Sequence, residues 1–382
     1  MKWNVDTNHY VYKSTDMIFG IGLFVYFFES ILRITTIPIS IPNRLCQLFV
    51  IICSFVTVII HGKVSKKALL LKISVILLAL VVYSIIDRFD LLLLIALVIA
   101  AQYVSEKHII KTALVMHLFF LIVCTILSAI GAIQNYCYDD VRGVRQSLGY
   151  LSYNYPSKVV FFCIMYYLYL KKGKLKLIEI SAMVICSVLY CIETNSRSTM
   201  YIIPFIIVLD FLLEKYHDKI FNLRYSFFIC YTFVFMAVIS IGVELFYMNE
   251  PEKLQVLDQW TTHRLSITAN TINEYGWSLF GNRIVWTGVS NSFQAYSQYN
   301  FVDCSYINVL LNYGLIFTVC LIAGFTKLMK VALSSHNHRL ILVLFAIALR
   351  SVIEPQLIDV RFNTFILLIL PAYIHFSKNS YN

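Results

Sequence analysis

The sequence has few charged residues, because only 14% of its 382 residues are Asp, Glu, Lys or Arg. A soluble globular domain carries about 25%. The chain is also 59% hydrophobic, whereas soluble domains are about 45–50% apolar. An internal core cannot cover so much apolar surface, so lipid must cover most of it. We therefore exclude an ordinary soluble protein and expect an integral membrane protein.

Metal-site and disulfide patterns are missing as well. The 10 cysteines form no Cys-x-x-Cys pair and no cluster with histidine, so we expect neither a zinc site nor a disulfide framework. No internal repeat or low-complexity segment is present. The amino-terminal region has no cleavable signal pattern, and its first apolar run is long enough to remain as an anchor. We expect one transmembrane domain over residues 1–382 and no metal or other cofactor.

Apolar runs long enough to cross a bilayer, which takes about 20 residues, follow one another along the chain. Some of the runs are shorter than this, among them 90–104, 156–170 and 340–353. The expected fold class is an all-α polytopic membrane protein with about 12 transmembrane helices. The predicted spans are 17–35, 44–61, 68–86, 90–104, 112–133, 156–170, 177–194, 199–213, 225–247, 304–326, 340–353 and 362–376.

Basic residues orient these spans. Lysine-rich loops fall between every second pair of spans, and the positive-inside rule places them and both termini in the cytoplasm. Of 19 lysines, 16 lie in predicted cytoplasmic segments, whereas of 12 arginines only Arg224 and Arg339 do. Lysines selected in this way explain the net charge of +10, so nucleic acid is not an expected partner. The arginines at or near the outer face are Arg33, Arg44, Arg88, Arg142, Arg145, Arg197, Arg264, Arg283, Arg350 and Arg361.

An outer face rich in arginine predicts an anionic ligand there, because the guanidinium group binds phosphate and carboxylate through paired hydrogen bonds. The alternative is ordinary pairing with acidic residues and lipid headgroups. One large extracytoplasmic loop, 248–303, follows the ninth span, and a second outer loop covers 134–155. Within the large loop, 256–275 is predicted to form an amphipathic helix along the membrane. Long, aromatic-rich loops of this kind usually carry function.

Short motifs follow one another in the outer loops and the helices that adjoin them. In order they are R-x₂-LGY-x₃-N-x-P at 145–156, TNSRS at 194–198, HRL at 263–265, LFGN at 279–282 and VDCSYINVLLNYG at 302–314. In this order, over roughly residues 140–320, the chain resembles the bacterial O-antigen and capsular polysaccharide polymerases (Wzy), which are related to the O-antigen ligases. Ligases of that superfamily have a histidine at the start of the helix after the large loop. Asp303 occupies that place here, which favours a polymerase.

The resemblance implies an enzyme that joins oligosaccharide repeat units carried on undecaprenyl diphosphate. The reaction takes place at the outer face of the bacterial cytoplasmic (inner) membrane and supplies O-antigen, capsule or exopolysaccharide. Implied partners are the lipid-linked oligosaccharide, membrane lipids, a chain-length regulator protein and a flippase.

The residues can be weighed by their own chemistry. Transfer from a diphosphate needs a cation near the departing phosphate, and the chain has no Asp-x-Asp pair to hold a metal. Arginines can supply that charge by preorganised hydrogen bonds. The predicted catalytic residues are Arg197, Arg264, Asp303 and Arg142, and the predicted substrate-binding residues are Arg145, His263, Glu193, Asn154, Tyr306 and Trp277.

Each candidate also has an ordinary structural explanation. Arg197 is alternatively an interfacial residue whose long side chain reaches the headgroups. The alternative for Arg142, Arg145 and Arg264 is a loop-stabilising ion pair. Asp303 is placed either to accept a proton from a sugar hydroxyl or to cap the following helix. His263 is a base by type or a bystander, and Trp277 stacks on sugar or anchors the loop at the interface.

Two alternatives remain open. A flippase of lipid-linked oligosaccharide also suits twelve spans, although transporters usually show paired halves and broken helices near the midplane. The halves of this sequence do not resemble each other, and its arginines cluster at one surface. An O-antigen ligase-type transferase is the second alternative.

Overall fold

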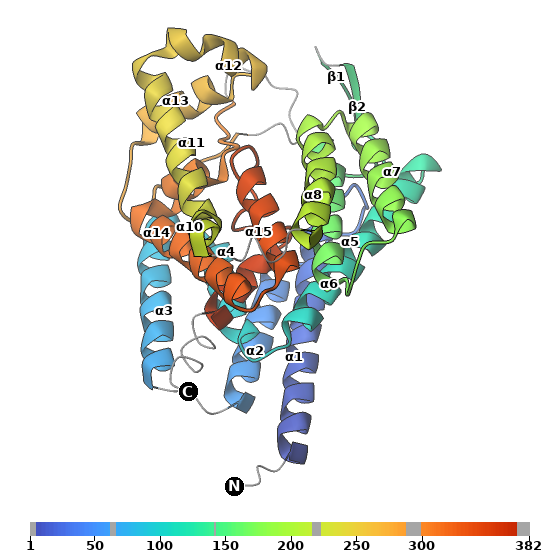
Figure 1. Cartoon of the computed structure of the whole chain (residues 1–382), viewed down its shortest axis with the longest axis vertical. Helices are drawn as coiled ribbons and strands as arrows, with labels where there is room; N and C mark the ends of the chain where they lie inside the picture. The colour runs from blue at the N-terminus through green and yellow to red at the C-terminus, as the bar shows by residue number, and fades with distance from the viewer. Residues whose placement is uncertain (1–4, 62–65, 141–142, 216–222, 288–298, 373–382) are drawn as a thin grey trace. The chain divides into compact units, whose positions relative to one another are not determined.

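Figure 1 shows the computed structural model of the chain, which describes residues 5–61, 66–140, 143–215, 223–287 and 299–372. Within these ranges the regular structure is helical apart from one antiparallel hairpin, formed by β1 (Cys137–Asp140) and β2 (Gly143–Gln146). The expectation of an all-α architecture is therefore confirmed at this coarse level.

Seven of the described helices are long and apolar enough to cross a membrane. Many of their exposed side chains are large and hydrophobic, such as Leu70, Phe55 and Val238, as contact with lipid requires. The seven are α1 (Val5–Leu32, apolar from Ser14), α2 (Asn43–His61), α3 (Lys66–Ile86, apolar from Ala68), α5 (Glu106–Ala129), α7 (Leu177–Thr194), α11 (Thr232–Asn249) and α14 (Ser305–Ser334).

The other predicted spans are shorter, more polar or divided, so twelve spans stays a prediction. The predicted span 225–247 is two helices, α10 (Leu223–Cys230) and α11, which meet at Tyr231. The predicted span 362–376 begins with a 3₁₀ helix, η3 (Thr364–Leu368), and lies outside the described residues from 373 on. The helices at the remaining predicted spans are α4 (Phe89–Ala101), α6 (Asn154–Leu170), α8 (Arg197–Lys215) and α15 (His338–Arg350).

Contacts divide the chain into two compact units, and the single-domain organisation stays a prediction. Unit 1 comprises Met1–Ser74, Leu93–Lys215 and Val360–Asn382, and unit 2 comprises Val75–Leu92 and Tyr216–Asp359. In unit 1, α5 packs against α1 and α6, and α7 packs against α6, α8 and β2. Its centre is α6, where Tyr166 is fully buried and its hydroxyl lies 2.8 Å from that of Thr364.

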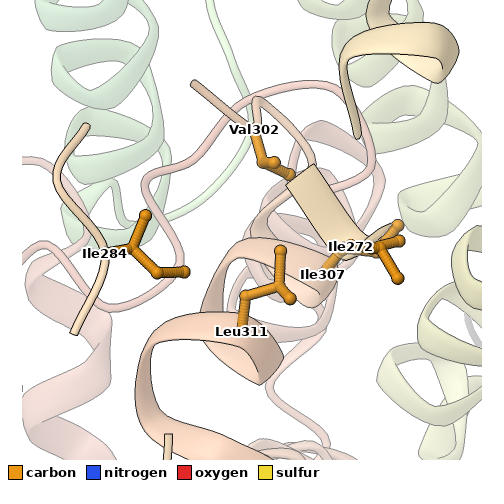
Figure 2. Close-up of a cluster of buried hydrophobic side chains, with 5 residues drawn as sticks. All are labelled: Ile272, Ile284, Val302, Ile307 and Leu311. Carbon is orange, nitrogen blue, oxygen red and sulfur yellow. The ribbon is translucent and has the colours of Figure 1, made fainter. Parts of the chain in front are cut away.

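In unit 2, α14 packs against α10, α11 and α15, and α13 (Arg264–Tyr275) packs against α11 (Figure 1). A buried cluster joins α13, α14 and the chain between them. It consists of Ile272, Ile284, Val302, Ile307 and Leu311 (Figure 2). Because these side chains come from four separate segments, their burial fixes where α13 and the segments at 284 and 302 lie on α14.

The segment after α11 is helical, but the prediction of one helix over 256–275 was wrong. The structure has a 3₁₀ turn, η1 (Pro251–Leu254), then α12 (Gln255–Trp260) and α13. Thr262 and His263 separate the two helices, and both have a φ of 60°. A right-handed helix cannot continue through that conformation, so the chain turns before α13 begins.

Candidate functional site

The candidate site in unit 2 centres on an ion pair between Arg264 and Asp303. Arg264 is the first residue of α13, and Asp303 lies two residues before α14. The Nε atom of Arg264 lies 3.0 Å from Oδ2 of Asp303, and the two side chains are 34% and 19% exposed. Nη1 of Arg264 also donates a hydrogen bond to the carbonyl of Ile353. The two predicted residues are thus brought together at a partly exposed position.

This geometry changes the interpretation of Asp303. Cys304, not Asp303, is the N-cap residue of α14. The carboxylate of Asp303 instead faces a guanidinium from another helix. The pair links α13 to the start of α14, as the loop-stabilising explanation of Arg264 requires. It also puts a guanidinium cation and a carboxylate side by side at a partly exposed position, and these are groups that can bind an anion and accept a proton.

His263 lies next to this pair in sequence but is held by another acid, Asp258. Its Nδ1 atom lies 3.2 Å from Oδ2 of Asp258, and its side chain is 67% exposed. Oδ1 of Asp258 accepts hydrogen bonds from the backbone N–H groups of Leu265 and Ser266, at 3.0 and 3.1 Å. Asp258 therefore caps α13 from the preceding helix and positions Arg264 at its start. Asp258 was not predicted from the sequence, because a cap seven residues from its donor follows no standard spacing.

Replacing Asp258 with alanine is expected to loosen the first turn of α13, since two N–H groups lose their acceptor. A lost cap costs about 0.5–2 kcal/mol. Hydrogen exchange of the amides in 264–275 should accelerate by about tenfold, and Asp258→Asn should have a smaller effect because one acceptor oxygen remains. Glu252→Ala, at an exposed site in η1, is the control and should change nothing. Unchanged exchange in Asp258→Ala would contradict the capping role.

The LFGN and NYG motifs meet at a break in α14. Gly314 has a φ of 83° and a ψ of 172°, which interrupts the helix. A break leaves backbone groups without helical partners, and the segment 278–282 supplies them. The N–H of Leu315 donates to the carbonyl of Ser278 at 3.0 Å, and that of Ile316 donates to Leu279 at 3.2 Å. These motif residues thus complete a broken apolar helix.

The same segment is tied to α14 on the other side of the break. The N–H of Asn282 donates to the carbonyl of Leu311 at 3.1 Å. Gly281 lies against the backbone of Asn312, where a Cβ would not fit. The indole N–H of Trp286 donates to the side-chain oxygen of Asn312 at 2.9 Å. We call this arrangement of 278–282 against 311–316 the α14 interlock.

Tyr306 and Trp277, the remaining predicted residues of unit 2, differ in how far their side chains are exposed. Tyr306 is fully buried, and its hydroxyl donates to the carbonyl of Ala348 in α15 at 3.0 Å. In this structure it packs α14 against α15, so the substrate-binding role predicted for it has no surface to act on. Trp277 is 44% exposed, next to the α14 interlock.

In unit 1, the TNSRS motif forms the turn between α7 and α8. Thr194 ends α7 with its hydroxyl donating to the carbonyl of Tyr190, at 2.6 Å, and Asn195 follows in a left-handed conformation. Arg197 then begins α8 and is exposed, as is Glu193 one residue before the end of α7. The motif therefore makes a tight helical hairpin with an exposed arginine at its tip.

Arg145 and Asn154 lie in the second predicted outer loop. Arg145, in β2, is 4% exposed, and its guanidinium lies 4.7 Å from the centre of the Tyr153 ring. Asn154 begins α6 and is partly buried. Tyr150, from the same motif, is fully buried, and this burial raises the pKa of its hydroxyl well above its usual range. Arg145 and Tyr150 of this motif are thus buried within the loop. Arg142 lies outside the described residues.

The chain matches no family model, no curated protein and no solved structure. The resemblance based on motif order therefore rests on the residues of this chain alone.

Proposed function

We propose that this chain is a metal-independent glycosyltransferase of the polysaccharide polymerase type. It would join oligosaccharide repeat units linked to undecaprenyl diphosphate at the outer face of the bacterial cytoplasmic membrane. The observation that carries the proposal is the partly exposed Arg264–Asp303 pair. The order of the motifs and the seven helices apolar enough for a membrane support it.

The proposed reaction assigns one role to each member of the pair. The bond between the anomeric carbon of the donor glycan and its diphosphate breaks, and a bond from that carbon to an acceptor hydroxyl forms. Arg264 stabilises the charge on the departing diphosphate, and Asp303 accepts the proton of the acceptor hydroxyl. No metal is required, because the guanidinium supplies the positive charge.

The proposed topology follows the distribution of basic residues. Both termini would lie in the cytoplasm, with 248–303 and 134–155 on the opposite side. A flippase would deliver the lipid-linked units to that side, and a chain-length regulator would limit the polymer. The proposed flippase and chain-length regulator thus follow from the lipid-linked substrate and from its use on the side opposite the cytoplasm.

Reconstitution tests the proposal against its main rival. Purified protein in liposomes that contain only lipid-linked repeat units should extend them into a ladder of longer glycans, resolved by gel electrophoresis. Transfer of the substrate to the opposite leaflet without any chain growth would identify a transporter and overturn the proposal. Liposomes without protein are the control for spontaneous change.

Arg197, in unit 1, stays a predicted catalytic residue, and its exposure at the tip of the α7–α8 hairpin is compatible with that role. In the reconstituted assay, Arg197→Ala should slow chain growth by about 10²–10³, the loss typical for one donor to a developing oxyanion. Growth at the normal rate would show that the reaction does not need Arg197 and would leave the proposal resting on Arg264 and Asp303.

A further inference from the structure

A cavity of about 430 Å³ opens in unit 2 along α13. Its volume lies within the roughly 300–1,000 Å³ that is typical of small-molecule sites. The residues that determine its chemistry are Asn270, Thr271, Glu274, Tyr275, Tyr299 and Asn300. None of them belongs to the motifs that carry the family resemblance.

One face of α13 forms a wall of this cavity. Asn270, Thr271 and Glu274 recur at the helical spacing of three and four residues, which brings them to one side. The opposite side of the helix carries Ile272, which is buried in the cluster of Figure 2. The hydrophobic cluster therefore fixes the orientation in which α13 presents its polar residues.

Asn300 fixes the facing wall. Its side-chain amide donates to the carbonyl of Val285 at 3.1 Å, and its side-chain oxygen accepts from the N–H of Thr287 at 2.8 Å. Its backbone carbonyl accepts a hydrogen bond from the Thr271 hydroxyl at 3.0 Å. These bonds hold the two walls together at one end, so this part of the cavity is built before any ligand arrives.

The chemistry of the lining fits an uncharged polyol. The lining residues that the structure describes include an acid, amides, hydroxyls and two tyrosine rings, and no Lys, Arg or His. A carboxylate such as Glu274 repels phosphate but accepts hydrogen bonds from sugar hydroxyls. Amide groups both donate and accept, as sugar hydroxyls do, and tyrosine rings offer an apolar face for the C–H groups of a sugar ring.

We propose that this cavity binds neutral sugar residues of the glycan acceptor, an assignment that rests on the proposed function. Two links join the same pair of segments, Arg264 to Asp303 and Thr271 to Asn300. At 1.5 Å per residue, Asn270 and Glu274 lie about 9 and 15 Å along α13 from Arg264. A short oligosaccharide held in the cavity can therefore extend along α13 toward the ion pair, where its terminal hydroxyl reacts.

Binding of free oligosaccharides tests the cavity without requiring catalysis. The probe is the mixture of short oligosaccharides released by partial acid hydrolysis from the surface polysaccharide of the source cells. Purified full-length protein in nanodiscs should bind them, detected by saturation-transfer NMR and quantified by calorimetry. Asn270→Ala and Glu274→Ala should each weaken binding by about tenfold, the effect of one well-placed hydrogen bond.

The matched control is Asn273→Ala, because Asn273 is exposed on the same helix but does not line the cavity. It should bind like the unchanged protein. The cavity proposal would be overturned if the unchanged protein did not bind the oligosaccharides, or if Asn270→Ala and Glu274→Ala both bound them as tightly as the unchanged protein does.

The same variants separate failure of this proposal from failure of the proposed function. In reconstituted liposomes, the cavity variants should raise the acceptor concentration needed for half-maximal growth and leave the maximal rate nearly unchanged. Arg264→Ala should lose growth but keep oligosaccharide binding. A protein that binds these oligosaccharides at the cavity and never extends them would refute the polymerase and keep the sugar site. Normal growth kinetics in both cavity variants would refute the sugar site and keep the polymerase.

Discussion

Exchanging the charges of the central pair, in the double variant Arg264→Asp/Asp303→Arg, is expected to leave the protein folded and inserted but to abolish polymer formation. The ion pair can form in either direction, so a link between α13 and α14 survives the exchange. The proposed chemistry cannot survive it, because the cation and the proton acceptor change places relative to the donor diphosphate and the acceptor hydroxyl. A purely structural pair would tolerate the exchange.

The single variants give the size of the effect. Arg264→Ala and Asp303→Asn should each reduce chain growth by about 10²–10³. Arg264→Lys should recover little, because a lysine cannot form the paired hydrogen bonds of a guanidinium. Growth is measured as the glycan ladder made by reconstituted protein, and folding as a single symmetric peak in size-exclusion chromatography.

A second ion pair in unit 2 provides a matched control. Arg283 and Asp87 form a contact of 3.3 Å, and their side chains are 72% and 62% exposed. Such surface pairs contribute little to stability, so Arg283→Ala should leave both folding and chain growth unchanged. Full-length polymer from the charge-exchanged variant would show that the Arg264–Asp303 pair is a structural link and would remove it from the proposed mechanism.

Placing a side chain in the α14 interlock is expected to prevent unit 2 from folding stably. Gly281 and Gly314 have φ angles of 98° and 83°, and a residue with a Cβ in such a conformation costs about 1–3 kcal/mol. The Cβ would in addition overlap backbone atoms, those of Asn312 from Gly281 and those of Leu279 from Gly314. Backbone cannot move aside as a flexible side chain does, so the total should reach several kcal/mol.

Gly281→Ala and Gly314→Ala should therefore lower the yield of monodisperse protein and the midpoint of thermal unfolding in detergent. Gly242→Ala is the control, because Gly242 lies in α11 with open space around its Cβ position. Alanine favours a helix by about 1 kcal/mol over glycine, so this control should be neutral or stabilising. Equal stability of all three variants would contradict the interlock.

Much of the fold follows from composition and periodicity. Long apolar runs separated by basic loops predicted the helices, and α2, α3, α7 and α14 begin within two residues of the predicted starts. The prediction was less accurate where polar or short segments decide the structure. The break at Tyr231 and the turn at Thr262 and His263 lie inside segments that were predicted as single helices, and the hydropathy of these segments does not mark either break.

The candidate site was predictable only by residue type. Arg264 and Asp303 were both predicted from their chemistry. Their contact could not be predicted, because 38 residues separate them in the sequence. Tyr306 was chosen from a motif, but the structure buries it against Ala348. Asp258, Asn270 and Glu274 belong to no motif. Their contacts form only when α12 and α13 pack, so their roles could not be predicted from the sequence.

The sequence by itself determined that this chain is helical and apolar enough for a membrane, because both properties are sums over local residues. The tertiary structure decided which polar residues meet. It paired Arg264 with Asp303, used the LFGN and NYG motifs to complete a broken helix, and turned one face of α13 toward a polar cavity. Contacts between residues distant in sequence depend on packing of the hydrophobic cluster beneath α13, and no local pattern encodes that packing.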